Sequence, residues 1–544
     1  MVNNGFSVAF FVFKHAAEKC YLQSLPMTRI HSQPTGSESK RAGRASAEEV
    51  DRFGGWQEVD LGPSERFRLT RWRGGSWLVT PSGHPVVVVG LCHASLVPFR
   101  RKPGDFIEQR FQNDEGRYIA DLLAWMKNAG FNTFSYDVPA GAEAAMNCLG
   151  DLRLVPEFNK GPQFPDLFDP AWRSETACRI AAEVPRLRQN PRLIGYTLSS
   201  PLLFSPVMER PGIWHGGTIK RQNYMMATRS LPAGSAGKRA YVNFLRRTHR
   251  TFDSYVHRRG PVPGASSFDD LERVDLSSRD SYETLHPDDA AFYTDMWSDL
   301  TRFLVREIRR HDPDGLIFSY RILRIMRWPD PWLDAMLRGV GPHVDAFVPE
   351  LYGEHPWREV MDGIGEITGK PSLIADGMRL REFVYVDETD DLREGAAYEE
   401  MFTSLLASKW FLGGCLCEYQ GGQMRTQSYP PRAHVARSGI RNPDFTERGP
   451  LHTCFKRLHG TKHRLRLGAL RQVRGVALSS RVRGASGSFA PATRRESGSR
   501  AAGNKRAGRR PTTAPVQRSS PSSLRPGHSS GRAPPADSAR ARRR

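Results

Sequence analysis

The sequence lacks the marks of a disulfide-stabilised or membrane-spanning protein. Its cysteines are seven in number, scattered, and without a Cys-x-x-Cys pair. This pattern predicts neither a disulfide framework nor a structural zinc site, and it is typical of reducing surroundings. The apolar run from Gly5 to Phe13 has no Lys or Arg before it and is far shorter than the roughly 20 residues of a membrane-spanning helix. We therefore expect no membrane partner and favour a cytoplasmic location slightly over secretion.

The body of the chain also lacks net charge, although the whole chain does not. The 544 residues contain 79 Lys and Arg against 58 Asp and Glu, a net charge of +21. Residues 455–544 hold 23 of those basic residues and only two of the acidic ones, so the preceding 454 residues are neutral. Nucleic-acid binding depends on clustered positive charge. We therefore expect no nucleic-acid partner for the body.

Composition divides the chain into three parts. Residues 455–544 become almost wholly Arg, Ser, Ala, Gly and Pro toward the C-terminus, which predicts a disordered basic tail. That tail is either an arm for anionic surfaces or read-through from a GC-rich gene. Residues 1–50 are expected to be disordered, or to include an over-extended start before Met27. Residues 51–454 are the predicted globular domain.

Within the body, β-branched apolar runs alternate with amphipathic stretches, as in a parallel sheet covered by helices. Eight strands are predicted, at Val86 to Gly90, Asn132 to Tyr136, Leu152 to Phe158, Leu193 to Leu198, Leu316 to Tyr320, Val344 to Pro349, Ser372 to Ala375 and Gly414 to Glu418. Six helices are predicted between them, at Arg117 to Gly130, Trp172 to Leu187, Ala291 to His311, Pro331 to Val340, Trp357 to Thr368 and Tyr398 to Phe411.

This order of elements favours the α/β class and a (β/α)8 TIM barrel with a long insertion after strand four. The insertion, Ser199 to Thr294, is expected at the C-terminal face of the barrel, where loops shape access to a site. A doubly wound open sheet is the alternative fold. It is less favoured because no Gly-rich phosphate loop follows the first strand.

Several segments of the body together resemble known enzymes. They are SWLVTPSGHPVVVVGLCHAS, WMKNAGFNTFSYDV, HDPDGLIFSYRI, VDAFVPELYGEHPW and TGKPSLIADG. As a set they resemble the agarase-like glycoside hydrolases of the clan A barrel superfamily, which is also that of β-galactosidase-like enzymes. The resemblance covers roughly Trp77 to Arg425. It implies hydrolysis of a polysaccharide or β-galactoside-type glycan, with no cofactor and no metal.

The resemblance also implies two catalytic carboxylates, an acid/base after strand four and a nucleophile at the end of strand seven. This chain departs from that pattern at both positions. Pro201, after Ser200, stands where the acid/base Glu is expected, and Asp376 stands in place of the nucleophilic Glu. Proline has no proton to give, and Asp is one methylene shorter. A catalytically inactive barrel that binds glycan is therefore the alternative function.

Other strand-end side chains complete the candidate site. The catalytic candidates are Asp376, Glu350 and Glu157. The candidates for substrate binding are His93, Asp137, Tyr352, Glu418, Trp328 and Trp357. Each also has a structural interpretation, as an ion-paired carboxylate, a hydrogen-bonded core histidine or a buried aromatic residue.

Overall fold

The computed structural model describes residues 47–95, 106–156, 165–199, 202, 204–205, 207–209, 219–221, 223–276, 285–322, 328–352, 357–379, 391–417, 419, 439–442 and 444–485. Those up to Arg483 belong to one compact unit. Most of the predicted N-terminal extension and of the basic tail lies outside the described residues.

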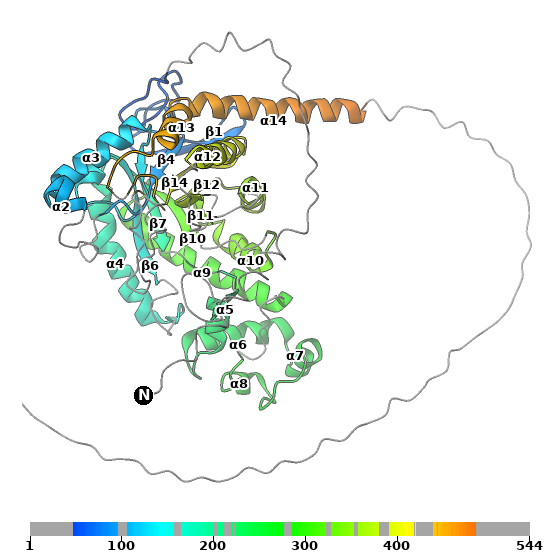
Figure 1. The fold of residues 1–544 in the computed structure, drawn as a ribbon. Helices are drawn as coiled ribbons and strands as arrows, with labels where there is room; N and C mark the ends of the chain where they lie inside the picture. Colours follow the sequence, from blue (N-terminus) through cyan, green and yellow to red (C-terminus); the bar gives the residue numbers. More distant parts are fainter. Residues whose placement is uncertain are drawn as a thin grey trace, which may run out of the picture. The chain divides into compact units, whose positions relative to one another are not determined.

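The centre of the compact unit is a closed barrel of eight parallel strands (Figure 1). In spatial order they are β4 (Val88–Leu91), β5 (Thr133–Phe134), β6 (Asn147–Val155), β7 (Leu193–Ser199), β10 (Leu316–Ile322), β11 (Ala346–Tyr352), β12 (Ser372–Ile374) with its continuation β13 (Asp376–Arg379), and β14 (Phe411–Leu416). The first strand pairs with the last, β4 with β14, so no edge is left open. The structure therefore confirms the (β/α)8 barrel and excludes the doubly wound sheet.

Helices follow the strands on the outside of the barrel. They are α3 (Glu115–Asn128), α4 (Pro170–Arg188), α9 (Pro287–His311), α10 (Pro331–Val340), α11 (Trp357–Thr368), α12 (Asp391–Leu406) and α13 (Gly449–His459), with the short α2 (Phe106–Phe111) before α3. The start of α10 is capped: the Asp330 side chain accepts from the backbone nitrogen of Trp332, and Pro331 fixes the first turn. After β5 a 3₁₀ turn, Ala142–Ala144, replaces a helix.

One predicted helix boundary is wrong. The segment from Tyr398 to Phe411 was expected to be a single helix, but α12 ends at Leu406 and Phe411 opens β14. The turn between them is held by Ser408, whose backbone nitrogen donates to the carbonyl oxygen of Leu405 and whose hydroxyl accepts from Trp410. A continuous apolar pattern thus spans two elements.

Apolar side chains fill one end of the barrel interior. Residues such as Val88, Phe318 and Val348 point inward from different strands and are buried. A three-stranded antiparallel sheet, β1 (Arg68–Trp72), β2 (Gly75–Val79) and β3 (Pro85–Val86), contributes Leu78 to the same cluster. These contacts lie at the amino-terminal ends of the strands. Polar side chains are therefore left to the carboxyl-terminal ends, which we call the mouth.

The predicted insertion after β7 forms a helical lobe. It contains β8 (Val207–Glu209), β9 (Ile219–Arg221), α5 (Tyr224–Arg229), α6 (Ala236–His249), α7 (Phe252–Arg259) and α8 (Phe268–Leu271). Figure 1 shows α6, α7 and α8 grouped on the opposite side of the barrel from β1. Asp289 on α9 fixes this lobe, because it accepts from the Tyr241 hydroxyl at 2.9 Å and from Arg259 at 2.8 Å.

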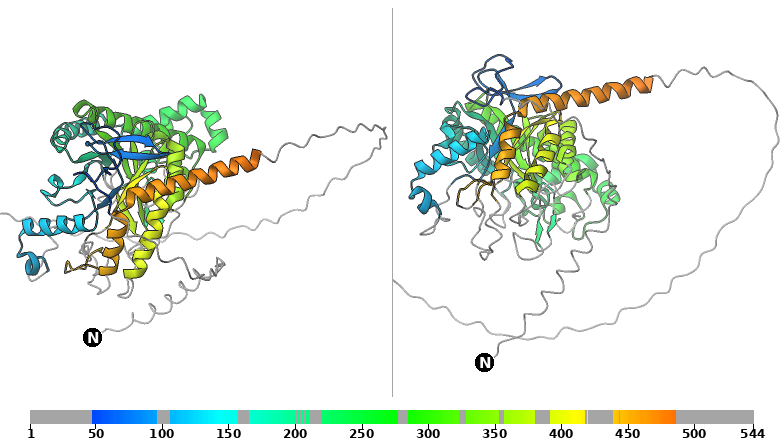
Figure 2. Two further views of the ribbon diagram at one scale, coloured as in Figure 1. Left: turned by 90° about the horizontal axis from the view of Figure 1, so that it is seen from above. Right: turned by 45° about the horizontal axis from the view of Figure 1, so that its top comes forward.

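The globular domain extends beyond both predicted boundaries. Helix α13 crosses residue 454, and α14 (Lys462–Ala485) follows it (Figure 2). Phe455, Leu458 and Leu470 are buried in the main core. At the other end Glu48 is buried and lies 2.6 Å from Nδ1 of His463. Composition placed these residues in disordered segments because Arg-rich helix surfaces dilute their apolar positions. None of the described helices is long and apolar enough to cross a bilayer.

Candidate functional site

Three polar residues form a hydrogen-bonded rim at the mouth, on consecutive strands. His93 follows β4, Asp137 follows β5 and Arg153 lies in β6. Nδ1 of His93 lies 2.7 Å from Oδ2 of Asp137, and Nη2 of Arg153 lies 3.3 Å from Oδ1 of the same carboxylate. Their side chains are 20%, 35% and 49% exposed, respectively, so they can reach both solvent and a ligand. The sequence analysis named His93 and Asp137 but missed Arg153.

All three rim residues have a backbone conformation that L-residues rarely adopt. The φ angles are 53° at His93, 49° at Asp137 and 48° at Arg153. Left-handed conformations at residues other than glycine cost of order 1 kcal/mol each and cluster at functional sites. Backbone hydrogen bonds hold the strained segment: the nitrogens of Ala94 and Ser95 both donate to the carbonyl oxygen of Asp137.

Beneath the rim lies a second group, here called the floor, formed by Tyr136, Arg321, Glu350 and Asp376. Glu350 and Asp376 are opposite each other on the neighbouring strands β11 and β13. Nη2 of Arg321 lies 2.7 Å from Glu350 Oε1 and 3.4 Å from Asp376 Oδ2, so one guanidinium serves both carboxylates. The Tyr136 hydroxyl donates to Asp376 Oδ2, and the Arg321 guanidinium stacks 3.5 Å above the Tyr136 ring.

Rim and floor carboxylates differ in their proton affinity. Burial raises the pKa of Glu350, against the opposing charge of Arg321. Burial likewise raises the pKa of Asp376, although His93 and two thiols act the other way. Burial also tends to raise the pKa of Asp137, but the contacts with His93 and Arg153 outweigh it and lower the pKa to about 2. Asp137 is therefore the carboxylate that is charged and accessible at neutral pH.

Several sequence candidates lie outside the described residues. They are Glu157 and Glu418, together with Ser200 and Pro201 of the degenerate acid/base segment. The backbone of Tyr352 ends β11, but its side chain is not among those described. Their assignments as site residues remain predictions.

The two tryptophans expected to stack on sugar rings are both packed against protein. Trp357 opens α11 and is 5% exposed within the main core. Trp328 is partly buried, and its ring occupies the space beside Gly363 of α11, where even a Cβ atom would clash. Both rings thus pack against α11 or the core, as expected for buried aromatic residues.

The mouth also brings together four groups that can bind a metal ion. Cys92 and His93 follow β4, Cys417 follows β14, and Asp376 begins β13. One ligand atom from each lies within 4.8 Å of all the others. The sequence analysis expected no metal site, because the cysteines form no Cys-x-x-Cys pair. It missed that a closed barrel places the ends of its first and last strands side by side.

Arg321 was also missed, for a reason that lies in the backbone. Leu316 and Phe318 point into the barrel, so simple alternation would turn residue 321 outward. The pairing of β10 with β11 shifts register between Phe318 and Arg321, a β-bulge that aims the Arg321 side chain inward instead.

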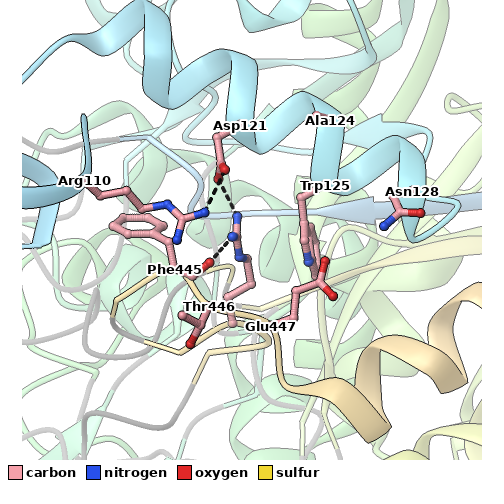
Figure 3. Close-up of a pocket in the computed structure, with 9 residues that line it drawn as sticks. Arg110, Asp121, Ala124, Trp125, Asn128, Phe445, Thr446 and Glu447 are labelled. Atoms are coloured by element: carbon pink, nitrogen blue, oxygen red, sulfur yellow. Dashed lines mark hydrogen bonds and ion pairs between the residues drawn. The ribbon is translucent and has the colours of Figure 1, made fainter.

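A separate pocket of about 550 Å³ lies between α3 and residues 441–447 (Figure 3). Its charged side chains are occupied with each other: Asp121 lies 2.6 Å from Nη1 of Arg441 and 3.0 Å from Nη2 of Arg110. Arg441 also contacts the rings of Trp125 and Phe445. We interpret this pocket as the joint between α3 and the C-terminal segment rather than as a ligand site.

A closed barrel of eight parallel strands, with charged side chains converging at the carboxyl ends of the strands, defines this protein as a (β/α)8 barrel. No protein-family model matches the sequence, and no curated protein sequence matches it.

Solved structures of agarases share this fold. A crystal structure of an agarase, AgWH50C, superposes with a TM-score of 0.62 at 15% identity, covering 77% of this chain and 68% of that one. An exo-beta-agarase has a TM-score of 0.62 at 14% identity, covering 86% and 72%. A third structure, PfGH50B, has 0.61 at 12% identity, covering 78% and 70%. The resemblance stated from sequence motifs is thus confirmed at the level of the fold.

Proposed function

We propose that the mouth binds a galactose-containing polysaccharide of the agarose type and that the buried pair Glu350 and Asp376 does not hydrolyse it. The observation that carries this proposal is the strained rim of His93, Asp137 and Arg153 above a floor in which Arg321 contacts both carboxylates. The substrate class rests on the fold shared with agarases.

The rim has the chemistry that sugar hydroxyl groups require. Asp137 is a charged acceptor, Arg153 is a charged donor, and both are partly exposed. Hydrogen bonds to charged groups contribute about 1.5–3 kcal/mol each, roughly twice as much as neutral ones. His93 orients Asp137 from below, so the pair presents a preorganised acceptor to a ligand.

The floor contains two carboxylates, but their burial and their contacts with Arg321 oppose two-carboxylate hydrolysis. The acid and the nucleophile must flank the glycosidic bond, about 5 to 5.5 Å apart for retention of configuration. Glu350 and Asp376 instead lie side by side on adjacent strands, 1% and 4% exposed, with Arg321 in contact with both. A carboxylate held in a buried ion pair is not free to protonate a leaving group.

Hydrolysis remains the second candidate function, favoured by one observation. Oxygens of Glu350 and Asp376 share a single guanidinium nitrogen, so they are at most about 6 Å apart, a spacing compatible with a retaining pair. In that case Asp376 is the nucleophile and Glu350 is the proton donor.

The test is to incubate the purified full chain with agarose oligosaccharides and to measure both binding and release of reducing ends. Cello-oligosaccharides serve as the control glycan. We expect binding without hydrolysis. Arg153→Ala should weaken binding about tenfold or more, because a charged hydrogen bond is lost. The exposed helix residue Arg186 provides the matched control, Arg186→Ala.

Two outcomes would contradict the proposal. Failure to bind agarose oligosaccharides, or equal binding of the control glycan, would show that an agarose-type polysaccharide is not the specific ligand. If the wild-type protein released reducing ends and Asp376→Asn did not, the function would be hydrolysis and not binding alone.

A further inference from the structure

We propose that Cys92, His93, Asp376 and Cys417 form a zinc-binding site beneath the rim of the mouth. Their four ligand atoms already lie within 4.8 Å of one another. Three of the residues are fully buried or nearly so, and His93 is the one whose side chain reaches solvent, at 20% exposed. This inference goes beyond the proposed glycan binding and does not depend on it.

Barrel closure creates this set of ligands. Leu416 of β14 pairs with Leu91 of β4, so the next residues, Cys417 and Cys92, lie on adjacent strands. Both belong to one small buried cluster with Tyr136. In a tetrahedral zinc site, bonds of about 2.0 to 2.3 Å place ligand atoms roughly 3.3 to 3.8 Å apart. The ligands therefore have to close by only about 1 Å around an ion.

The remaining atoms of two ligands are held by neighbouring groups, as in established zinc sites. His93 directs Nδ1 to Asp137, and its Nε2 lies 3.0 Å from the Tyr136 hydroxyl, a contact that a metal ion would replace. Asp376 directs Oδ2 to Tyr136 and Arg321, whereas Oδ1 lies 3.1 Å from Sγ of Cys92. Nε2 and Oδ1 are the atoms that would bind the ion in place of these contacts, and the carboxylate–histidine contact fixes the imidazole orientation.

The ligand types select the metal. Thiolate sulfur with imidazole suits Zn²⁺, whereas Mg²⁺ and Ca²⁺ prefer oxygen ligands alone. Two thiolates and one carboxylate around Zn²⁺ leave one negative charge, and Arg321 at 3.4 Å from Asp376 balances it. Four protein ligands fill a tetrahedral shell, as in structural zinc sites, so the ion would fasten the first strand to the last.

The simplest rival is that these groups only hydrogen-bond to one another. Sγ of Cys92 is placed to donate to Asp376 Oδ1 at 3.1 Å or to the carbonyl oxygen of Leu416 at 3.2 Å. A second rival is a disulfide between Cys92 and Cys417. Both rivals predict a protein that takes up no metal at this site.

The experiment uses the full chain, purified under reducing conditions, stripped with a chelator and titrated with Co²⁺ as the spectroscopic probe. We expect one equivalent to produce thiolate-to-cobalt charge-transfer absorption and tetrahedral visible bands, and Zn²⁺ to displace it. Zn²⁺ should also raise the Tm of the stripped protein. The absorption should be lost in the Cys92→Ser, Cys417→Ser double variant and kept in Cys415→Ser, which alters a buried thiol of the same strand outside the group.

The outcomes separate the possibilities. A stripped, folded wild-type protein that shows no cobalt absorption overturns the proposal, as does absorption that survives in the double variant. If the double variant does not fold, His93→Gln, at the partly exposed ligand, replaces it and must weaken Co²⁺ binding at least tenfold. Thiol counting that finds Cys92 joined to Cys417 in protein that binds no metal supports the disulfide instead. None of these readouts involves glycan, so failure here leaves the proposed function untouched.

Discussion

Arg321 and Glu350 form a buried ion pair inside the barrel mouth, with Nε and Nη2 of the guanidinium each 2.7 Å from Oε1 of the carboxylate. The two residues are 3% and 1% exposed. A buried pair costs much of its Coulomb energy in desolvation, but removal of one partner leaves an uncompensated charge. Arg321 also contacts Asp376, so the consequences of its removal for stability can be measured.

We expect Arg321→Met to lower the free energy of unfolding by about 3–5 kcal/mol, because the buried carboxyl groups of Glu350 and Asp376 lose their guanidinium partner. The double variant Arg321→Met, Glu350→Met should recover much of this loss. Urea unfolding at neutral pH measures both. Arg338→Ala is the control, since it removes an exposed i,i+4 pair with Asp334 and should cost less than about 1 kcal/mol. If Arg321→Met also lowered the free energy of unfolding by less than about 1 kcal/mol, this would contradict the buried ion pair.

The C-terminal histidines predict a loss of stability in mild acid. Burial lowers the pKa of His463 to about 4 and that of His459 to about 3. Unfolded histidine titrates near 6.5, so below that pH the unfolded chain binds protons that the folded chain excludes. Stability is therefore present above about pH 6.5 and is lost as the pH falls toward 4. Between pH 7 and 5 the free energy of unfolding should fall by on the order of 2 to 4 kcal/mol.

Substitution of one histidine tests this origin. His463→Asn keeps an N–H donor near Glu48 and should reduce the pH dependence by the share of one group. The exposed His257→Asn on α7 is the control and should leave the profile unchanged. An unchanged profile in His463→Asn would show that other groups cause the loss.

The extent of the domain predicts the effect of truncation. A chain that ends at Cys454 lacks the buried Phe455, Leu458 and Leu470, each of which contributes about 1.5–3 kcal/mol by burial. The sum is comparable to the whole stability of a typical domain, so this chain should not fold. A chain that ends at Ala485 should keep the Tm of the full protein, because residues 471–473 of α14 are already exposed. Circular dichroism melts of both truncated chains and of the full protein measure these differences in Tm.

Two glycines predict opposite effects of the same substitution. A Cβ at Gly195 in β7 would lie 2.4 Å from the carbonyl oxygen of Leu316 on the neighbouring strand, so Gly195→Ala should destabilise the barrel by several kcal/mol. A Cβ at Gly468 in α14 meets nothing within 4 Å. Gly468→Ala should therefore stabilise the helix by about 0.5–1 kcal/mol. The denaturant midpoints of the two variants, each compared with that of the wild-type protein, test the sign of each change in stability.

Much of the fold could be predicted because the barrel strands are strongly apolar and separated by amphipathic helices. Runs such as Val86 to Gly90 identify the eight strands, and alternation along β11 from Ala346 through Val348 correctly turns Glu350 inward. Strand and helix ends were less accurate, as at Phe411, because a continuous apolar pattern does not show where the backbone changes direction.

The candidate site could be predicted only in part, since its chemistry depends on contacts between distant residues. Asp376, His93 and Asp137 were named as candidates because each directly follows a predicted strand or strand end. Arg321 was not, because a bulge reverses its direction, and Cys92 and Cys417 gave no local signal at a separation of more than 300 residues. The pairing of Glu48 with His463 was invisible for the same reason.

That last pairing has a consequence for synthesis. Glu48 binds a residue 415 positions later, and β4 pairs with β14 across most of the domain. On the ribosome the barrel therefore cannot close until β14 has emerged from the exit tunnel, and Glu48 cannot meet its partner until α14 has emerged. The polypeptide must be carried through almost all of its translation as an open sheet with an unpaired edge, which makes the growing chain a substrate for chaperones until its final helices arrive.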